Sequence, residues 1–177
     1  MNNIDSVISW INDLLNDLRD RVCVEWINRA WYSIGTEAHY FWEIDQLSPE
    51  YVLDAKVAFE KYMGGTVFLD KLNEEQVQYS AIKAGLEAKI AEVRYFHKED
   101  RESRKIIYTS QDCIAFTQYR RSGPEARLFA TLRSSDVENL LPVDFYGLLW
   151  ILYTLDPSYG PAVVSITINN PHIRRTK

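Results

Sequence analysis

A chain of 177 residues is long enough to bury one substantial core, so we expect a single domain over residues 1–177. Its net charge of −5 at pH 7 provides no basic field, which argues against nucleic acid as a partner. No apolar run reaches the length of a membrane span, and the N-terminus lacks the features of a signal peptide. We therefore expect a cytoplasmic protein that has no membrane partner.

Helical signals dominate the first half of the chain. Apolar residues recur at helical spacing over 4–18. A second helix begins at Ser48-Pro49, a cap followed by a first-turn proline, and ends at Gly64-Gly65. Residues 66–69 favour a short strand. A third helix over about 73–94 has the residues of a capping box at its start.

Strand signals dominate the second half. A turn at 122–124 separates two strands, and an apolar helix over 142–155 has the composition of a buried helix. The predicted strands are 106–108, 113–119, 127–132 and 162–168. Helices that precede strands, with one helix buried among those strands, predict an α+β fold with a mostly antiparallel or mixed sheet.

The most informative stretch lies directly before the predicted buried helix. It contains Arg133, Ser134, Asp136 and Asp144. Charged groups packed against a core segment are costly unless they have partners, and a ligand is one kind of partner. Cys113 lies twenty positions before Arg133. Together these residues suggest a ligand that bears a phosphate and a nucleophile that acts on it.

The order and spacing of these residues resemble the thymidylate synthase superfamily, over roughly residues 95–177. Family members hold the nucleotide with an Arg-Ser-x-Asp segment followed by Pro-x-Asn, and this chain has that segment with Asp144 in place of the Asn. The nucleophilic Cys of the family corresponds to Cys113, and a basic pair ahead of it corresponds to Arg104 and Lys105. The resemblance implies a thymidylate synthase-like fold and a homodimer.

The resemblance also implies a role for each residue. Cys113 would add to C6 of a pyrimidine base, and Asp136 would contact the pterin of 5,10-methylenetetrahydrofolate. The other residues would bind the nucleotide: Arg133 and Ser134 its phosphate, His172 its sugar hydroxyl, and Arg104 and Lys105 the phosphate held by the partner subunit. Each type also has an ordinary explanation, since an unpaired Cys is most often a small buried hydrophobe and an Asp often caps a helix. The two cysteines, Cys23 and Cys113, form no metal-binding motif, and a disulfide between them stays open.

Asp144 bears on the choice of base. The Asn of the family reads uracil, because its amide donates to O4 and accepts from N3–H. A carboxylate has no donor for O4 but accepts well from the N4 amino group of cytosine. The resemblance therefore implies a pyrimidine nucleoside monophosphate in which cytidylate (dCMP or CMP) is favoured over dUMP. The alternative is that Asp144 merely complements the dipole of the following helix.

Several functions stay open. The first is a pyrimidine nucleotide C5-methyl- or hydroxymethyltransferase, and the second is a nucleotide-binding homologue that has lost catalysis. A hydrolase or transferase that uses Cys113 and His172, or a protein-interaction module, would be a different class. The family also uses a Glu on an N-terminal helix as its acid/base, for which Glu25, Glu37 and Glu43 are candidates.

Overall fold

The architecture is known from a computed structural model, which describes most of the chain. The described residues are 3–20, 22–27, 30–35, 37–74, 87, 90–91, 106–109, 113–136, 140–157 and 160–176. The helices with bounds in this part are α1 (Asn3–Asp20), α2 (Pro49–Met63), α3 (Thr66–Glu74) and α5 (Leu141–Leu155). Among them, no helix is long and apolar enough to cross a membrane.

The described strands form two sheets. The larger sheet has the order β3 (Ala38–Ile44), β8 (Ala162–Ile168), β6 (Glu125–Leu132), β5 (Ile114–Ser122) and β4 (Ile106–Thr109). The smaller has the order β1 (Val22–Ile27), β2 (Ala30–Gly35), β9 (Pro171–Thr176) and β7 (Ser135–Asp136). Only the pairs β6–β8 and β7–β9 of these sheets are parallel. The predicted α+β class with a mixed sheet is confirmed.

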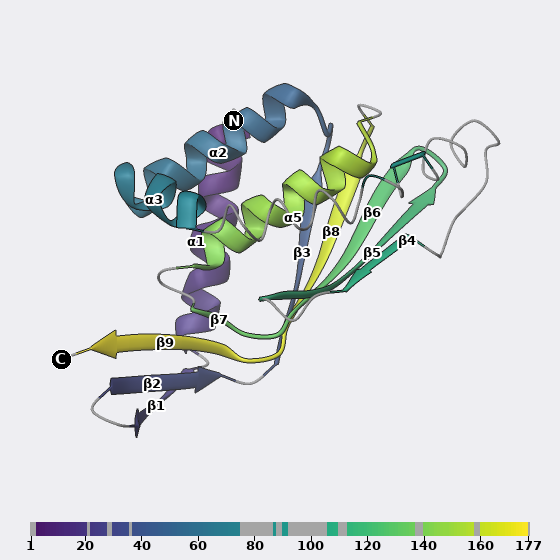
Figure 1. Ribbon diagram of the computed structural model, residues 1–177. Helices are drawn as coiled ribbons and strands as arrows, with labels where there is room; N and C mark the ends of the chain where they lie inside the picture. Colours follow the sequence, from purple (N-terminus) through teal and green to yellow (C-terminus); the bar gives the residue numbers. More distant parts are fainter. Residues whose placement is uncertain are drawn as a thin grey trace.

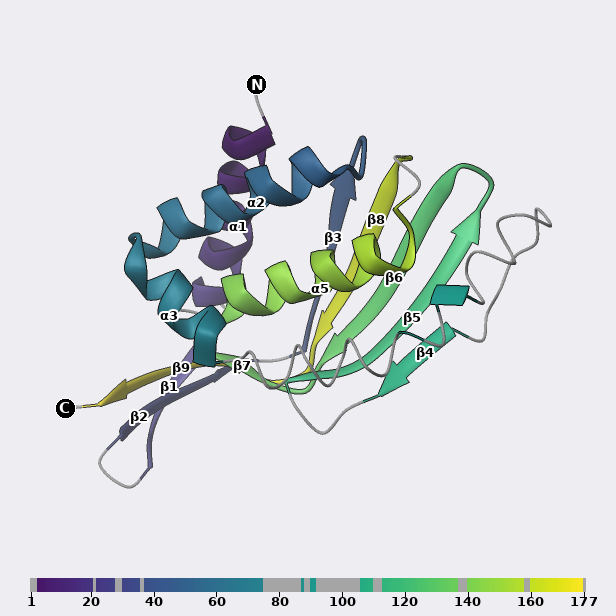
Figure 2. The ribbon, with the colours of Figure 1, turned by 45° about the horizontal axis from the view of Figure 1, so that its top comes forward.

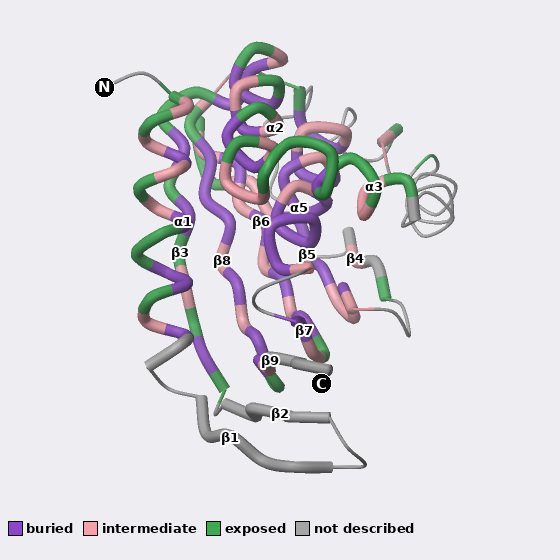
Figure 3. The backbone as a smooth tube through the Cα atoms, turned by 90° about the vertical axis from the view of Figure 1, so that its left-hand side faces the viewer, coloured by how far each residue is buried: buried purple, intermediate pink, exposed green. Residues whose placement is uncertain are grey.

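The helices lie on the same side of the five-stranded sheet, and the four-stranded sheet extends from one end of it (Figures 1 and 2). Helix α5 runs across the middle of this sheet, where it contacts β5 and β6, and it also contacts β7 of the smaller sheet. It is buried along nearly its whole length (Figure 3). A helix that is apolar on all sides has to be buried, so the central buried helix predicted from 142–155 is confirmed.

Alternation along the strands divides the larger sheet into two faces. On β3, Ala38, Trp42 and Ile44 are buried against the helices, whereas His39 and Phe41 are exposed on the opposite face. This two-residue period is that of a strand packed on one side. We call the side away from the helices the outer face; no described element covers it (Figure 2).

A row of aromatic rings joins the helices to the sheet. Trp10 of α1 stacks on Trp42 of β3, with ring centroids 4.8 Å apart. Phe59 of α2 lies 6.0 Å from Trp42 in an edge-on arrangement and 6.1 Å from Phe68 of α3. Phe68 lies 5.9 Å from Tyr146 of α5. Such pairs add to the free energy of burial, so these rings fix how four helices sit on one another and on the sheet.

The capping signals of the second helix are confirmed. The Ser48 hydroxyl accepts a hydrogen bond from the Tyr51 backbone N–H at 3.1 Å, and Pro49 is the first helical residue. At the other end Gly64 has φ of +84°, a conformation that costs glycine little, and its N–H donates to the Glu60 carbonyl.

Three predictions for the first half are wrong or incomplete. Residues 66–69 begin helix α3 instead of forming a strand, because Phe68 is fully buried between aromatic rings of α2 and α5. The predicted helix over 73–94 does not begin at Asn73, which lies in α3; most of that range is outside the described residues, although Glu87, Ile90 and Ala91 are helical. Residues 21–47, which showed no clear period, contain the strands β1, β2 and β3.

Candidate functional site

The β5–β6 hairpin brings Cys113 and Arg133 side by side. Ile114 pairs with Leu132 at the open end of the hairpin, so the next residue on each strand is Cys113 or Arg133. The Arg133 backbone N–H donates to the Cys113 carbonyl at 2.8 Å and extends the ladder by one bond. A β-bulge between Ile114 and Phe116 lies next to this pair, a position where bulges often re-aim side chains near active sites. The spacing of twenty residues is thus the length of a hairpin.

The turn between β8 and β9 holds the segment after Arg133. The Asn170 side-chain amide donates to the Arg133 carbonyl at 3.0 Å, and the Asn169 N–H donates to the Leu132 carbonyl at 3.0 Å. The Ser135 N–H points back to the Asn170 carbonyl, at a longer distance of 3.4 Å. These bonds fix the backbone of the Arg-Ser-Ser-Asp segment on both sides. They also supply the partners that buried backbone groups need.

The parallel pairing of β7 with β9 places Asp136 beside His172. Asp136 is only 8% exposed, whereas His172 is half-buried. The His172 Nδ1 lies 3.3 Å from the Asn170 carbonyl, which can only accept, so this bond selects the tautomer protonated at Nδ1. The two predicted site residues therefore share one end of the smaller sheet.

Asp144 lies in the first turn of α5, where its negative charge complements the helix dipole. Its side chain points to the segment that holds Arg133: Oδ2 accepts a hydrogen bond from the Ser135 hydroxyl at 2.7 Å. Asp144 is 6% exposed and Ser135 is 1% exposed. A short bond to a buried carboxylate is a strong one, so α5 and β7 are tied together at this point.

The remaining predicted residues differ in exposure. Arg133 is exposed, and Cys113 and Ser134 are half-buried. Cys113 is present as a thiol. Arg104 and Lys105 lie outside the described residues. The structure thus gathers Cys113, Arg133, Ser134, Asp136, Asp144 and His172 at the end of the larger sheet where the smaller sheet begins.

No protein-family model matches the chain, and neither does any curated protein. A solved structure that does match is the thermostable thymidylate synthase A from Bacillus subtilis. The two chains share 12% sequence identity and superpose with a TM-score of 0.54, over 95% of this chain and 79% of that one. The chain has a thymidylate synthase-like fold. The fold implied by the sequence resemblance is confirmed, and at this identity the match speaks for the fold alone.

Two residues of this candidate site are not among the predicted ones. Ser135 is the residue that contacts Asp144, and Asn170 is the side chain that holds the Arg133 backbone. A signal for Asn170 exists in the sequence, since Asn-Asn-Pro is typical of a turn. None distinguishes Ser135 from Ser134, because the two are adjacent and only the position of α5 selects between them.

The glutamates proposed as acid/base do not lie on helices. Glu43 belongs to β3 and is exposed on the outer face, and Glu37 precedes β3, where it pairs with the exposed His39 at 3.1 Å. Glu25 belongs to β1. None of the three candidates therefore lies on a helix, unlike the acid/base of the family, and the identity of an acid/base stays a prediction.

Proposed function

We propose that the protein binds a pyrimidine nucleoside monophosphate, cytidylate in preference to dUMP, and transfers a methyl or hydroxymethyl unit to C5 of the base. The observation that carries this proposal is the joint placement of Cys113 beside Arg133 and of Asp144 against Ser135. Hydrogen bonds thereby hold the backbones of Cys113 and Arg133, and the buried Asp144 carboxylate, at one end of the sheet. The thymidylate synthase-like fold supports the same class of function.

Arg133 and the hydroxyl of Ser134 would bind the phosphate. Arg133 is exposed next to a backbone fixed by Cys113 and Asn170, so its side chain extends from a rigid base. A planar guanidinium suits the two-point recognition of phosphate oxygens. The His172 ring, half-buried beside Asp136, would meet the sugar hydroxyl.

Asp144 would select the base. A carboxylate has about four acceptor positions, and the Ser135 hydroxyl uses one of them on Oδ2. The N4 amino group of cytosine supplies a donor to this group, whereas O4 of uracil would face a negative oxygen. A buried acceptor that meets an acceptor costs about 1–3 kcal/mol, which corresponds to a preference for cytidylate of roughly 5- to 150-fold.

Cys113 would be the nucleophile. Its thiol is half-buried, and a guanidinium close to the sulfur would favour the thiolate, which is the nucleophilic form. Bond formation between Sγ and C6 moves the C5=C6 electron pair to C5. C5 then becomes nucleophilic and its hydrogen exchanges with water.

The carboxylate of Asp136 has the chemistry to meet the N–H donors of a pterin, and its position next to Ser135 fits 5,10-methylenetetrahydrofolate as the cofactor. When bound, that cofactor supplies the one-carbon unit. Asp136 would orient it, because a carboxylate that is 8% exposed on a strand has little freedom to move.

The test is the release of tritium from C5-labelled dCMP and dUMP, with and without the folate. We expect release from dCMP that is abolished in Cys113→Ser and retained in Cys23→Ser, the matched change of the other cysteine. Release from neither nucleotide, or equal release from Cys113→Ser, would contradict catalysis by Cys113.

The alternative is a nucleotide-binding homologue without catalysis. The positions of Glu25, Glu37 and Glu43 favour it, since none of these lies on a helix. Binding of dCMP without release of label, weakened by Arg133→Gln, is the outcome that this alternative predicts.

We also propose that the protein is a single domain and forms a homodimer through the part of the outer face around Phe41 and Phe129, which leaves the β5–β6 turn uncovered. This face has a shallow pocket lined by residues from β3, β6 and β8, among them Phe41 and Phe129, and Phe41 is 63% exposed. Arg104 and Lys105, which directly precede β4, would then reach the phosphate of the partner subunit. Sedimentation velocity tests it: Phe41→Lys with Phe129→Lys should give monomers, and a wild-type monomer would contradict the dimer.

A further inference from the structure

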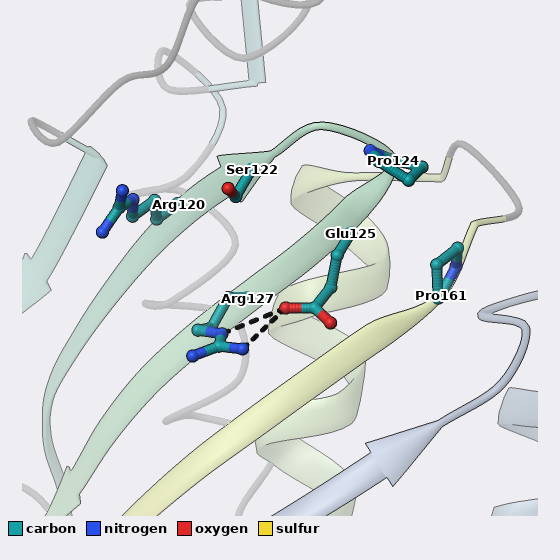
Figure 4. Close-up of a pocket in the computed structure, with 6 residues that line it drawn as sticks. All are labelled: Arg120, Ser122, Pro124, Glu125, Arg127 and Pro161. Carbon is teal, nitrogen blue, oxygen red and sulfur yellow. Dashed lines mark hydrogen bonds and ion pairs between the residues drawn. The ribbon is translucent and has the colours of Figure 1, made fainter.

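A charged pocket lies on the outer face, at the turn between β5 and β6. It has a volume of about 480 Å³ and is lined by Arg120, Ser122, Pro124, Glu125, Arg127 and Pro161 (Figure 4). Arg127 lies near the start of β6, whereas Arg133 follows its end. At about 3.3 Å per residue these positions are about 20 Å apart along the strand. The pocket is therefore separate from the site around Cys113.

Two like charges oppose each other in this pocket. Arg120 and Arg127 are direct partners in the antiparallel ladder, so both side chains lie on the outer face. Like charges at such positions destabilise a sheet. Glu125 lies on the same face two residues before Arg127, and its Oε1 accepts from Arg127 Nη2 at 2.7 Å and from Nε at 3.2 Å.

The lining residues thus carry two guanidinium groups and one carboxylate. This positive balance stands out on a chain with a net charge of −5. An anion that lies between Arg120 and Arg127 would lower the repulsion energy between the two guanidinium groups.

We propose that this pocket binds the phosphate group of a small phosphomonoester. The Nε–H and Nη2–H groups of Arg127 donate to Glu125, so Nη1 is the nitrogen that would donate to the phosphate. The Ser122 hydroxyl adds a neutral donor, and Pro124 and Pro161, which have no N–H groups, also line the pocket (Figure 4). The volume lies in the range of about 300–1,000 Å³ that is typical of small-molecule sites.

The proposal is tested by side-chain NMR of the full chain. Inorganic phosphate, dCMP and deoxycytidine are titrated while the Nε–H signals of Arg120 and Arg127 are followed. We expect both signals to shift together with phosphate and with dCMP, but not with deoxycytidine, which lacks the phosphate. Arg127→Lys keeps the charge but loses the planar donors, and it should weaken binding at least tenfold.

Charge-matched variants separate specific binding from general attraction. In variants that lack the arginine signals, binding is followed by the phosphate-dependent shifts of Ser122. Arg120→Gln with Arg127→Gln should abolish these shifts. Lys56→Gln with Lys61→Gln on α2 removes the same charge and should leave them unchanged. Arg133→Gln should also leave them unchanged, so failure of the nucleotide site does not affect this result. Absence of shifts with phosphate, or equal weakening in the lysine control, overturns the proposal. Binding of an acidic peptide without binding of phosphate overturns it too.

Discussion

Removal of the Arg121 guanidinium should destabilise the protein far more than removal of the nearby Arg127 guanidinium. On the helix side of β5, Arg121 Nη1 lies 2.9 Å from Asp156 Oδ2. The Tyr119 hydroxyl donates to the same oxygen at 2.6 Å. The Asp156 side chain is fully buried at the C-terminal end of α5, and that of Arg121 is 24% exposed.

The size of the effect follows from this burial. Arg121→Met leaves a buried carboxylate without the guanidinium, which costs about 3–5 kcal/mol. For a chain of this length each kcal/mol lowers Tm by about 2–4 °C, so we expect a decrease of roughly 6–20 °C. Arg127→Met breaks an ion pair whose side chains are 40% and 34% exposed, and exposed pairs are worth about 0–1 kcal/mol.

Urea unfolding and thermal unfolding of the two variants provide the measurement. A double variant, Arg121→Met with Asp156→Asn, should recover much of the loss, because the uncompensated charge is then gone. Two results would contradict this role of Arg121. One is that Arg121→Met is no less stable than Arg127→Met, and the other is that the double variant is less stable than Arg121→Met alone.

Three further predictions concern the nucleotide site and the core. Asp144→Asn should move the preference from dCMP towards dUMP by about 1–3 kcal/mol in competition binding, whereas Asp136→Asn, which also removes one buried carboxylate, should leave the preference unchanged. Ser135→Ala should lower the unfolding free energy by about 1.5–3 kcal/mol, because it removes a buried bond to a charged group; Ser134→Ala should weaken phosphate binding instead and alter stability by less than about 0.5 kcal/mol. Burial raises the pKa of Tyr51 to about 12, so its contribution is complete below about pH 10 and is lost as the pH rises through 12. Between pH 9 and 11 the wild type should lose about 1–2 kcal/mol more than Tyr51→Phe, as measured by urea unfolding, and equal losses would contradict this assignment.

Local signals predicted those elements whose ends are fixed by local chemistry. Ser48 and Gly64 bound α2 through bonds to residues three or four positions away, and these are visible in the sequence. The sequence of strand β3 shows no clear alternation, because Phe41 is an apolar residue on the exposed face. The β-prone residues 66–69 form a helix because the burial of Phe68 depends on rings from α2 and α5, and tertiary packing then outweighs propensity.

The same distinction applies to the site. The grouping of Cys113 with Arg133 was predictable, because one hairpin fixes the distance between them. The contact of Asp144 with Ser135 was not, since it depends on where α5 crosses β7. The acid/base that the resemblance implies is not predictable either. It would come from the first half of the chain, and only the packing of that half decides which of its residues lies near Cys113.

The residues proposed to bind the phosphate and the base are held by short-range bonds to β6, β7 and the β8–β9 turn, so they stay in place whatever the first half supplies. If the protein has the proposed function, nucleotide binding and C5 chemistry would therefore be separable. A protein that binds dCMP through Arg133 and Asp144 but exchanges no label would have kept the first and lost the second. Release of the label also needs a group that takes up the C5 proton, and none of the candidates Glu25, Glu37 and Glu43 lies on a helix.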